Sequence, residues 1–367
     1  MLISTFLGSL YDKVLVLGNK KYWFLGLGLV FLVVVVINGI AIVPQEPYQR
    51  LSENPFSTRT DIHFWNYFQE TLLLPVIANF LKLTSPLTFN LLCMLIIIGG
   101  YSLFAFLVFH RWGASVSLIF STLLITSPLT TVILTWLGMP DGLTLALLIP
   151  LLFTNSFPLI FSLTVFGAAN HFIFIIAAIE IFILRWLIRD TIDIRHLLLA
   201  LIGGLTGLAV VQIFHNSYQI EVVSRSSFVL LKSMEDWLAL NVRHLPMSVF
   251  SLFNMNWFAL IVCYMMFFKQ DKRFYLAVLF ILNLNYGITF FSLDTTRIFS
   301  MLSWGVFATV IFHSYRIALD HSSEHKKQFL QALILIGIIS IFTPRYFSWA
   351  GDIHTTPFYD FLKRLIL

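Results

Sequence analysis

Acidic, basic and histidine residues recur in the short turns between long apolar segments. Glu46 and Asp61 follow the first apolar segment, Asp141 lies in GMPDG, and His171 lies in GAANH. Carboxylates beside apolar surface suit general-base work, because burial disfavours their charged form and raises the pKa. Arginines suit phosphate, because one guanidinium donates two parallel hydrogen bonds. The remaining candidates are Asp294 and Arg297 in SLDTTR and Arg345 in TPRYFSW.

Each candidate also has a structural interpretation. Asp141 is typical of a turn or a helix cap, and Asp294 of a cap with a local ion pair to Arg297. Glu46 could be a solvated loop acid, and His171 could hydrogen-bond at an interface. The functional interpretation depends on whether the intervening elements bring these residues to one side of a membrane.

The composition places the chain among membrane proteins. It is 58% hydrophobic and 11% charged, with a mean hydropathy of +0.87, whereas soluble domains carry about 25% charged residues. The +5 net charge does not indicate nucleic acid, because the basic residues flank apolar segments. Cys93 and Cys263 lie inside such segments and are expected to be buried thiols rather than a disulfide. No cleavage site follows the first segment, which is expected to remain as a helix.

We therefore predict an all-α polytopic membrane protein with about eleven transmembrane helices, in a range of ten to twelve. A helix that crosses a hydrocarbon core of about 30 Å needs about 20 residues. The fourth and fifth segments are shorter, so they could be tilted, interrupted or re-entrant. The segments lie near 22–43, 86–109, 114–137, 142–154, 157–170, 172–188, 196–215, 247–268, 274–292, 298–314 and 329–343.

Charge predicts the orientation of the chain. With residues 1–21 in the cytoplasm, the short basic turns also fall there, as the positive-inside rule expects. The 44–85 loop, the 216–246 loop and the 344–367 tail are then extracytoplasmic, and the candidate residues share that side. The cytoplasmic turns contain Arg111, Arg185, Arg189, Arg195, Lys269, Lys272, Arg273, Arg316, Lys326 and Lys327.

The 44–85 loop contains a predicted amphipathic helix over about 61–76. Apolar residues recur there at three- and four-residue steps, which forms one apolar stripe. Such a helix is expected to lie flat at the membrane interface. The stripe consists of Ile62, Trp65, Phe68, Leu72 and Val76.

Glu180 stands apart because it lies inside an apolar segment, where a carboxylate is costly and is a functional candidate by default. It could instead pair with Arg185, or be protonated and hydrogen-bonded between helices. The motifs of nucleotide-binding sites and of common soluble hydrolases (GxxxxGK[ST], GxGxxG, GxSxG, HExxH) are absent from the sequence, as is CxxC.

Four stretches together resemble the GT-C superfamily of integral membrane glycosyltransferases. QEPYQRLSENPF is similar to the segment after the first span in such enzymes, and ETLLLPVIANFLKL to the segment before the second. LGMPDGLTLALLIPLLF is similar to the turn and helix that carry an acid near the reaction centre, and LDTTRIFSMLSW to a later outer-face motif with an Asp and an Arg ahead of a span. Family members often have paired acids after the first span. Here Gln45 precedes a single Glu46, so Asp61 could take that role, and a divalent metal stays possible.

The resemblance implies a donor carried on a polyprenyl phosphate and an acceptor on the outer face. Separately, the lack of sorting signals in the sequence favours a bacterial inner membrane. Arg297 or Arg345 would neutralise the phosphate, and Glu46 or Asp61 would accept the acceptor's proton. Asp141, His171 and Asp294 would contact substrate, and the 61–76 helix would border the lipid entrance. Membrane lipid and the lipid-linked sugar are the implied partners, with no nucleic acid and no required cofactor.

Two other functions stay open. Glu180, the short segments at 142–170 and several intramembrane asparagines suit a transporter. A non-catalytic assembly subunit of an envelope complex would tolerate loss of the outer acids. The glycosyltransferase is favoured, because most charged candidates fall at one predicted surface rather than at mid-membrane.

Overall fold

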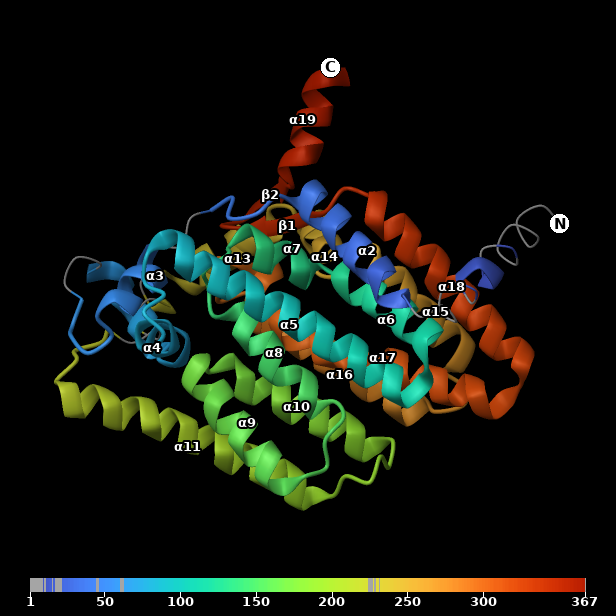
Figure 1. The fold of residues 1–367 in the computed structure, drawn as a ribbon, viewed down its shortest axis with the longest axis horizontal. Coiled ribbons are helices and arrows are strands. Elements are labelled where there is room, and N and C mark those ends of the chain that lie inside the picture. Colours follow the sequence, from blue (N-terminus) through green and yellow to red (C-terminus); the bar gives the residue numbers. More distant parts are fainter. Residues whose placement is uncertain are drawn as a thin grey trace.

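The computed structural model describes residues 22–43, 46–59, 63–223 and 232–366, together with positions 9, 11–14, 16, 227, 229 and 230. It is an α-helical bundle with one short hairpin (Figure 1). The helices of the first part of the chain are α2 (Trp23–Asn38), α3 (Glu46–Glu53), the 3-10 helix η1 (His63–Glu70), α4 (Leu73–Phe80), α5 (Pro86–Trp112), α6 (Ala114–Ile125), α7 (Pro128–Thr135), α8 (Asp141–Leu151), α9 (Phe157–Asn170), α10 (Ile173–Leu187) and α11 (Ile194–Tyr218). The second part contains α13 (Met234–Val242), α14 (Leu245–Ser251), α15 (Asn256–Phe267), α16 (Lys272–Thr289), α17 (Thr295–His321), α18 (Ser323–Phe342), β1 (Tyr346–Trp349), β2 (Asp352–Thr355) and α19 (Pro357–Ile366).

Helix α17 lies at the centre of the bundle. In its most apolar 18-residue window, 94% of the residues are buried, and α7, α10, α15, α16, α18 and β1 pack around it. Aromatic rings fill the space between α17 and α5, where Phe104 contacts Trp304 and Phe312 at centroid distances of 5.8 and 6.0 Å. The helix has 27 residues, which corresponds to about 40 Å at 1.5 Å per residue.

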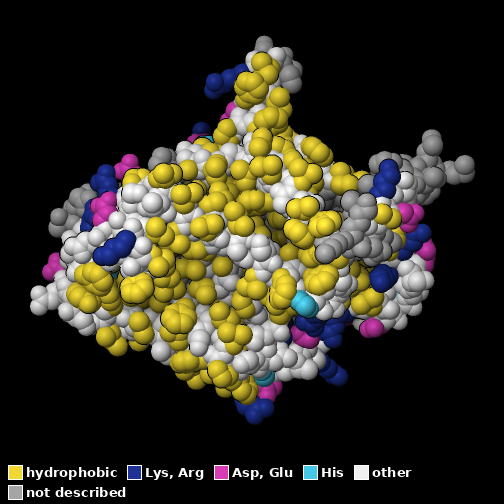
Figure 2. Space-filling view, viewed as in Figure 1, with side chains coloured by type: hydrophobic (Ala, Val, Ile, Leu, Met, Phe, Trp, Pro, Cys, Tyr) yellow, Lys and Arg dark blue, Asp and Glu magenta, His cyan; other side chains and the backbone are white. Residues whose placement is uncertain are grey.

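The described helices are those of a membrane protein. Four are long and apolar enough to cross a membrane, or six if each bent pair forms one span. Large apolar side chains also cover the outside, such as Phe280, which is 71% exposed on α16. Figure 2 shows apolar side chains over the middle of one face, with charged ones toward its edges. The all-α class is therefore as predicted, whereas the count of eleven spans is not confirmed.

Two predicted spans are sharply bent. The 114–137 segment divides into α6 and α7 at 54°, and the 247–268 segment into α14 and α15 at 79°. Pro128 begins α7 directly after Ser127, where proline is tolerated but cannot continue the preceding helix. Asn254, in the second break, has a φ of 46°, a left-handed conformation that asparagine adopts more readily than most residues.

The predicted continuous helix over 61–76 is not confirmed. Residues 60–62, which include Asp61, lie outside the described residues, and the next elements along the chain are η1 and then α4. The helical conformation is interrupted between η1 and α4, where Leu72 N–H donates to Ala169 O of α9 at 3.0 Å. Pro75 has no N–H and clashes with a preceding helical turn, so a single helix cannot run through this region.

The predicted 344–367 tail is ordered over its described residues. Strands β1 and β2 are antiparallel, with Trp349 opposite Asp352. Ala350 and Gly351 form the turn, with φ values of 53° and 82°, as the tight hairpin requires. Ala350 N–H donates to Leu293 O at 2.7 Å, which fixes the hairpin beside the start of α17. Helix α19 then projects from the body of the molecule (Figure 1).

Helices α9 and α11 pack closely against each other because glycines face the contact. A Cβ at Gly207 would overlap the backbone oxygen of Val165, and a Cβ at Gly203 would overlap the Thr164 hydroxyl. Small residues at such positions let two membrane helices approach closely.

We expect Gly207→Ala to lower the free energy of unfolding by about 1–3 kcal/mol, because the backbone of α9 must move to admit the methyl group. Gly287→Ala on α16 is the matched control, since no atom of the described residues lies within 4 Å of its Cβ position. Thermal unfolding of the purified protein in detergent measures both. Equal stability of the two variants would contradict the close packing.

Candidate functional site

Three predicted site residues meet at one buried ion pair. Arg297 donates from Nε to Asp141 Oδ2 at 2.6 Å and from Nη2 to Asp141 Oδ1 at 3.0 Å. Its Nη1 donates to Asp294 Oδ2 at 2.9 Å. Arg297 is 7% exposed and Asp141 is 1% exposed, so both charges are removed from water. Asp141, Asp294 and Arg297, which the sequence prediction places on one side of a membrane, are therefore in direct contact.

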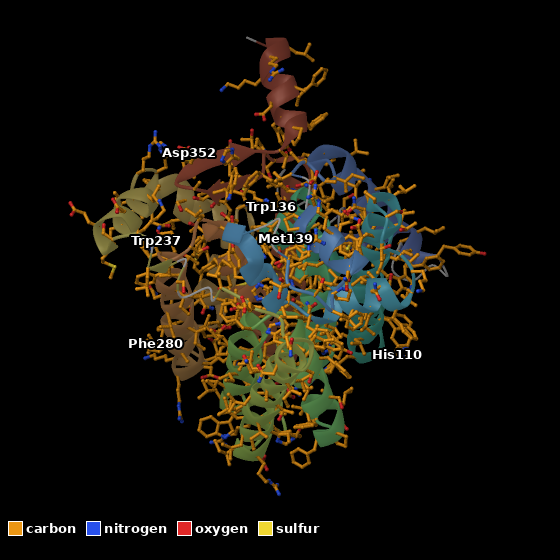
Figure 3. All side chains as sticks on the ribbon, turned by 90° about the vertical axis from the view of Figure 1, so that its left-hand side faces the viewer. His110, Trp136, Met139, Trp237, Phe280 and Asp352 are labelled. Carbon is orange, nitrogen blue, oxygen red and sulfur yellow. The ribbon has the colours of Figure 1, made fainter. Side chains whose placement is uncertain are left out.

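Local backbone structure positions each partner. Gly138 has a φ of 104° in the turn before α8, which places Asp141 in the first turn of that helix. Asp294 precedes α17, and Arg297 lies in its first turn. Figure 3 shows Trp136 and Met139, just before Asp141, in the upper part of the molecule and Asp352 of the hairpin above them.

All three nitrogens of the Arg297 guanidinium already donate to carboxylates of the protein. Two carboxylates face one guanidinium, so the group as a whole carries a net charge of about −1 at pH 7. A further anion would be repelled there. The role predicted for Arg297 as a phosphate ligand is therefore disfavoured, and its role here is to join α8 to α17.

His171 lies next to this ion pair but is used locally. It follows α9, is buried, and its Nδ1 accepts a hydrogen bond from Ile173 N–H at 3.3 Å. Its neighbour Asn170 donates to Pro140 O and Thr144 Oγ1, both at 2.9 Å, which ties the end of α9 to the start of α8. His171 thus supports the turn between α9 and α10.

Glu46 lies at the surface of the same end. It begins α3, is 64% exposed, and forms an ion pair with Arg50 at 2.9 Å. The buried face of α3 instead carries Tyr48, an electrostatic neighbour of Arg297. Glu46 therefore does not join the buried ion pair, and its predicted role as a base stays a prediction, as does that of Asp61.

Arg345 has the least usual environment of the predicted residues. It is 2% exposed, yet its Nε, Nη1 and Nη2 atoms have no hydrogen-bond partner within the described part of the chain. The charged or titratable groups that act on it are Tyr359 and Tyr101, which are neutral at pH 7. Burial lowers the pKa of the Arg345 guanidinium to about 10. A buried and unpaired cation is costly, and an anionic ligand would remove that cost.

The segments that meet around Arg345 also leave hydroxyl and amide oxygens without partners. Val43 N–H donates to Thr135 O at 3.1 Å, which holds the end of the first helical segment against α7. Tyr359 donates to Phe342 O at 2.8 Å and so holds α19 against the end of α18. Phe347 of β1 contacts Trp136 at 5.1 Å. Over the residues that the structure describes, the unpartnered oxygens of these segments are Asn38 Oδ1, Ser127 Oγ, Thr131 Oγ1, Thr135 Oγ1, Ser340 Oγ and Thr356 Oγ1.

Sequence reasoning missed these hydroxyls. In TSPLTTVILT, Ser127, Thr131 and Thr135 recur every four residues, which places them on one face of a helix. All three side-chain oxygens are buried without a partner from the described ranges. The spacing was available from the sequence, but nothing in the sequence placed α7 beside Arg345.

Glu180 is buried in the middle of the bundle. Its Oε2 accepts from Asn285 Nδ2 at 3.0 Å, and Asn285 also donates to Ser303 Oγ at 3.1 Å. The predicted alternative of a pair with Arg185 is wrong, because Arg185 binds Asp190. Glu180 Oε1 and Asn285 Oδ1 have no partner in the described structure.

Among the described residues, no group of three or more His, Cys, Asp or Glu could hold a metal ion.

No protein-family model, curated protein or solved structure matches the chain. The site is therefore interpreted from its own geometry. That geometry distinguishes a neutralised arginine, Arg297, from an unneutralised one, Arg345, at the same end of the bundle.

We expect Asp141→Asn to lower the free energy of unfolding by about 3–5 kcal/mol, because it removes the buried carboxylate that accepts two of the hydrogen bonds of the Arg297 guanidinium. Glu46→Gln is the control, since its ion pair is exposed and such pairs contribute little. Denaturant unfolding of both purified variants measures the difference. An Asp141→Asn protein as stable as Glu46→Gln would show that the ion pair does not hold α8 to α17.

Proposed function

We propose that the protein is an integral membrane glycosyltransferase that transfers a sugar from a polyprenyl-phosphate carrier to an acceptor hydroxyl. The observation that carries this proposal is Arg345, a buried guanidinium whose three nitrogens are unpartnered among the described residues. A phosphate monoester or diester has the charge and the acceptor oxygens that this group requires. A polyprenyl chain would bring such a phosphate to the headgroup level of a membrane.

The order of the elements supports the same proposal. A first apolar helix, α2, leads into the surface helices α3, η1 and α4, and the long apolar α5 follows. The side chain of Gln49 on α3 donates to Thr84 O, just before α5, so these helices pack back onto the start of that span. They lie beside Arg297 through Tyr48. In the proposed topology this end faces away from the cytoplasm, in a bacterial inner membrane, and residues 1–21 lie in the cytoplasm.

The proposed reaction is a substitution at the anomeric carbon. The acceptor oxygen forms a bond to that carbon while the bond to the phosphate oxygen breaks, and the phosphate keeps the electron pair. Arg345 stabilises the negative charge that develops on the leaving phosphate, which is most effective in a site removed from water. Glu46 or Asp61 would accept the proton of the acceptor hydroxyl. The Asp141 to Arg297 pair holds α8 and α17 in place around the site.

Replacement of Arg345 by methionine tests the proposal. We expect Arg345→Met to raise the free energy of unfolding of the ligand-free protein by about 1–4 kcal/mol, because an apolar side chain replaces a buried unpaired charge. The same variant should lose binding of farnesyl phosphate, a short polyprenyl phosphate, measured by tryptophan fluorescence of the purified protein. It should also lose transfer from a panel of radiolabelled polyprenyl-phosphate sugars.

Arg243→Met is the matched control, because Arg243 is exposed and pairs with Asp352 at the same end of the molecule. It should bind farnesyl phosphate as the wild type does. Unchanged binding by Arg345→Met would contradict the proposed phosphate site. Binding without transfer of any sugar from the panel would contradict the glycosyltransferase proposal but keep the site.

A transporter is the second candidate, and the buried Glu180, whose Oε1 has no partner among the described residues, favours it. A carboxyl group inside a span is typical of a proton or ion pathway. Under this alternative, Glu180→Gln should abolish substrate flux in liposomes. Under the glycosyltransferase proposal, the same variant should keep sugar transfer near the wild-type rate.

A further inference from the structure

A second arginine cluster lies at the opposite end of α17. Arg316 follows Arg297 by nineteen residues in this one continuous helix, a separation of about 28 Å at 1.5 Å per residue. That distance matches the roughly 30 Å thickness of a bilayer's hydrocarbon core. The two clusters are therefore spaced along α17 as the two headgroup levels of a bilayer are.

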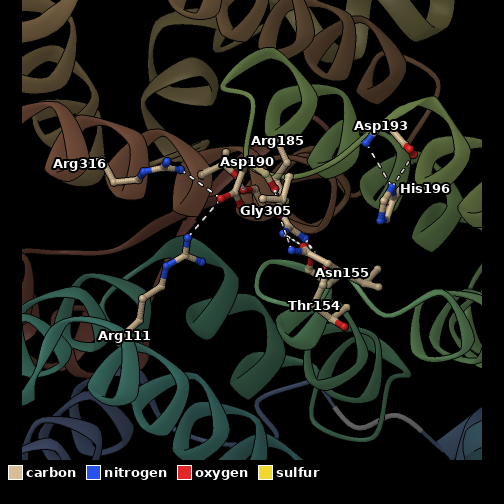
Figure 4. Close-up of polar contacts among 12 residues, drawn as sticks. Arg111, Thr154, Asn155, Arg185, Asp190, Asp193, His196, Gly305 and Arg316 are labelled. Carbon is tan, nitrogen blue, oxygen red and sulfur yellow. Dashed lines mark hydrogen bonds and ion pairs between the residues drawn. The ribbon is translucent and has the colours of Figure 1, made fainter.

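The cluster joins three helix ends through one acid (Figure 4). Asp190 Oδ1 accepts from Arg111 Nη2 at 3.3 Å and from Arg316 Nη1 at 3.2 Å. Asp190 Oδ2 accepts from Arg185 Nε at 3.1 Å. Three guanidiniums share one carboxylate, so these four side chains carry a surplus of two positive charges.

The three arginines are not equivalent. Arg185 is buried, and its other nitrogens donate to Leu151 O and Thr154 O at 2.7 Å and to the Asn155 side chain. Arg111 and Arg316 have side chains 34% and 38% exposed, and Asp190 accepts one hydrogen bond from each. The surplus charge is thus presented to the surface by Arg111 and Arg316.

The surroundings are those of a membrane interface. The Arg111 guanidinium lies 5.0 Å from the ring centroid of Trp112, and that ring contacts Tyr315 at 5.9 Å. Lys326 lies 6.0 Å from the Tyr315 ring and adds a further cation. Tryptophan and tyrosine favour the headgroup level of a bilayer, where their rings are apolar and their polar groups reach water.

Apolar surface continues from this cluster toward the middle of the molecule. Large exposed side chains lie within one or two helical turns of its arginines, where acyl chains would lie in a bilayer. They are Phe106 and Phe109 of α5, which precede Arg111 along that helix. A soluble anion would contact only the arginines, whereas a lipid would contact the arginines with its headgroup and the apolar side chains with its acyl chains.

We propose that Arg111 and Arg316 bind the phosphate of an anionic phospholipid headgroup at this end of the bundle. The lipid joins the ends of α5 and α17 from outside, as Asp190 joins them from inside. This site is separate from the polyprenyl-phosphate site at Arg345 and does not depend on it.

Titration with short-chain phosphatidylglycerol tests the proposal. The protein is purified in a zwitterionic detergent, and bound lipid is counted by native mass spectrometry. We expect Arg111→Gln/Arg316→Gln to weaken binding about tenfold or more, because two charge-assisted hydrogen-bond donors are lost. Arg195→Gln/Arg273→Gln is the control, since it removes two exposed arginines at the same end of the bundle and should change binding less than about twofold.

The arms of the experiment separate the possible ligands. Phosphatidylcholine should bind weakly to the wild type, and inorganic phosphate at equal concentration should not displace phosphatidylglycerol. Equal occupancy by inorganic phosphate, or equal losses in the control variant, would overturn the proposal. If the double variant does not fold, Arg111→Gln alone serves, because Asp190 keeps two arginine partners. Unchanged lipid binding in that folded variant would also overturn it.

Discussion

The burial of α17 creates the constraint on which the rest of the structure depends. This helix carries Arg297 into the interior, and a buried guanidinium needs compensating charge and hydrogen-bond acceptors. Asp141 supplies two acceptor oxygens and Asp294 a third. Asp141 begins α8, and Asn170 of α9 donates to Pro140 O in the turn just before it. The ion pair that balances the charge of Arg297 therefore fixes the relative positions of α8, α9 and α17.

Arg345 is the exception at this end of the bundle, and the proposed function rests on it. The same end of the molecule that neutralises Arg297 with two carboxylates leaves Arg345 buried, with no acceptor from the described residues. An apolar side chain there would cost less than a buried, unpaired guanidinium, so the proposed function assigns to Arg345 a ligand that supplies the missing acceptors. The phosphate of a lipid-linked substrate meets this requirement, because it is anionic and arrives within the membrane.

The sequence predicted the membrane class, most helix positions and the shared location of Asp141, Asp294 and Arg297. The membrane class and the helix positions follow from the low charge content and the long apolar segments, which can be recognised from neighbouring residues alone. The breaks at Ser127 and Asn254 were missed, since proline and asparagine also occur in helices that continue. Above all, the sequence did not show that Arg297 is neutralised whereas Arg345 is not. That difference depends on contacts between residues more than one hundred and fifty positions apart, such as Arg297 and Asp141.

The proposed function depends on the binding of a phosphate by Arg345. A structure of the purified protein with farnesyl phosphate in lipid nanodiscs tests it most directly. We expect density for the phosphate within hydrogen-bond distance of the Arg345 guanidinium, with the isoprenoid chain leading to the lipid. An Arg345 that donates to protein carbonyls or carboxylates, with the phosphate elsewhere, would contradict it.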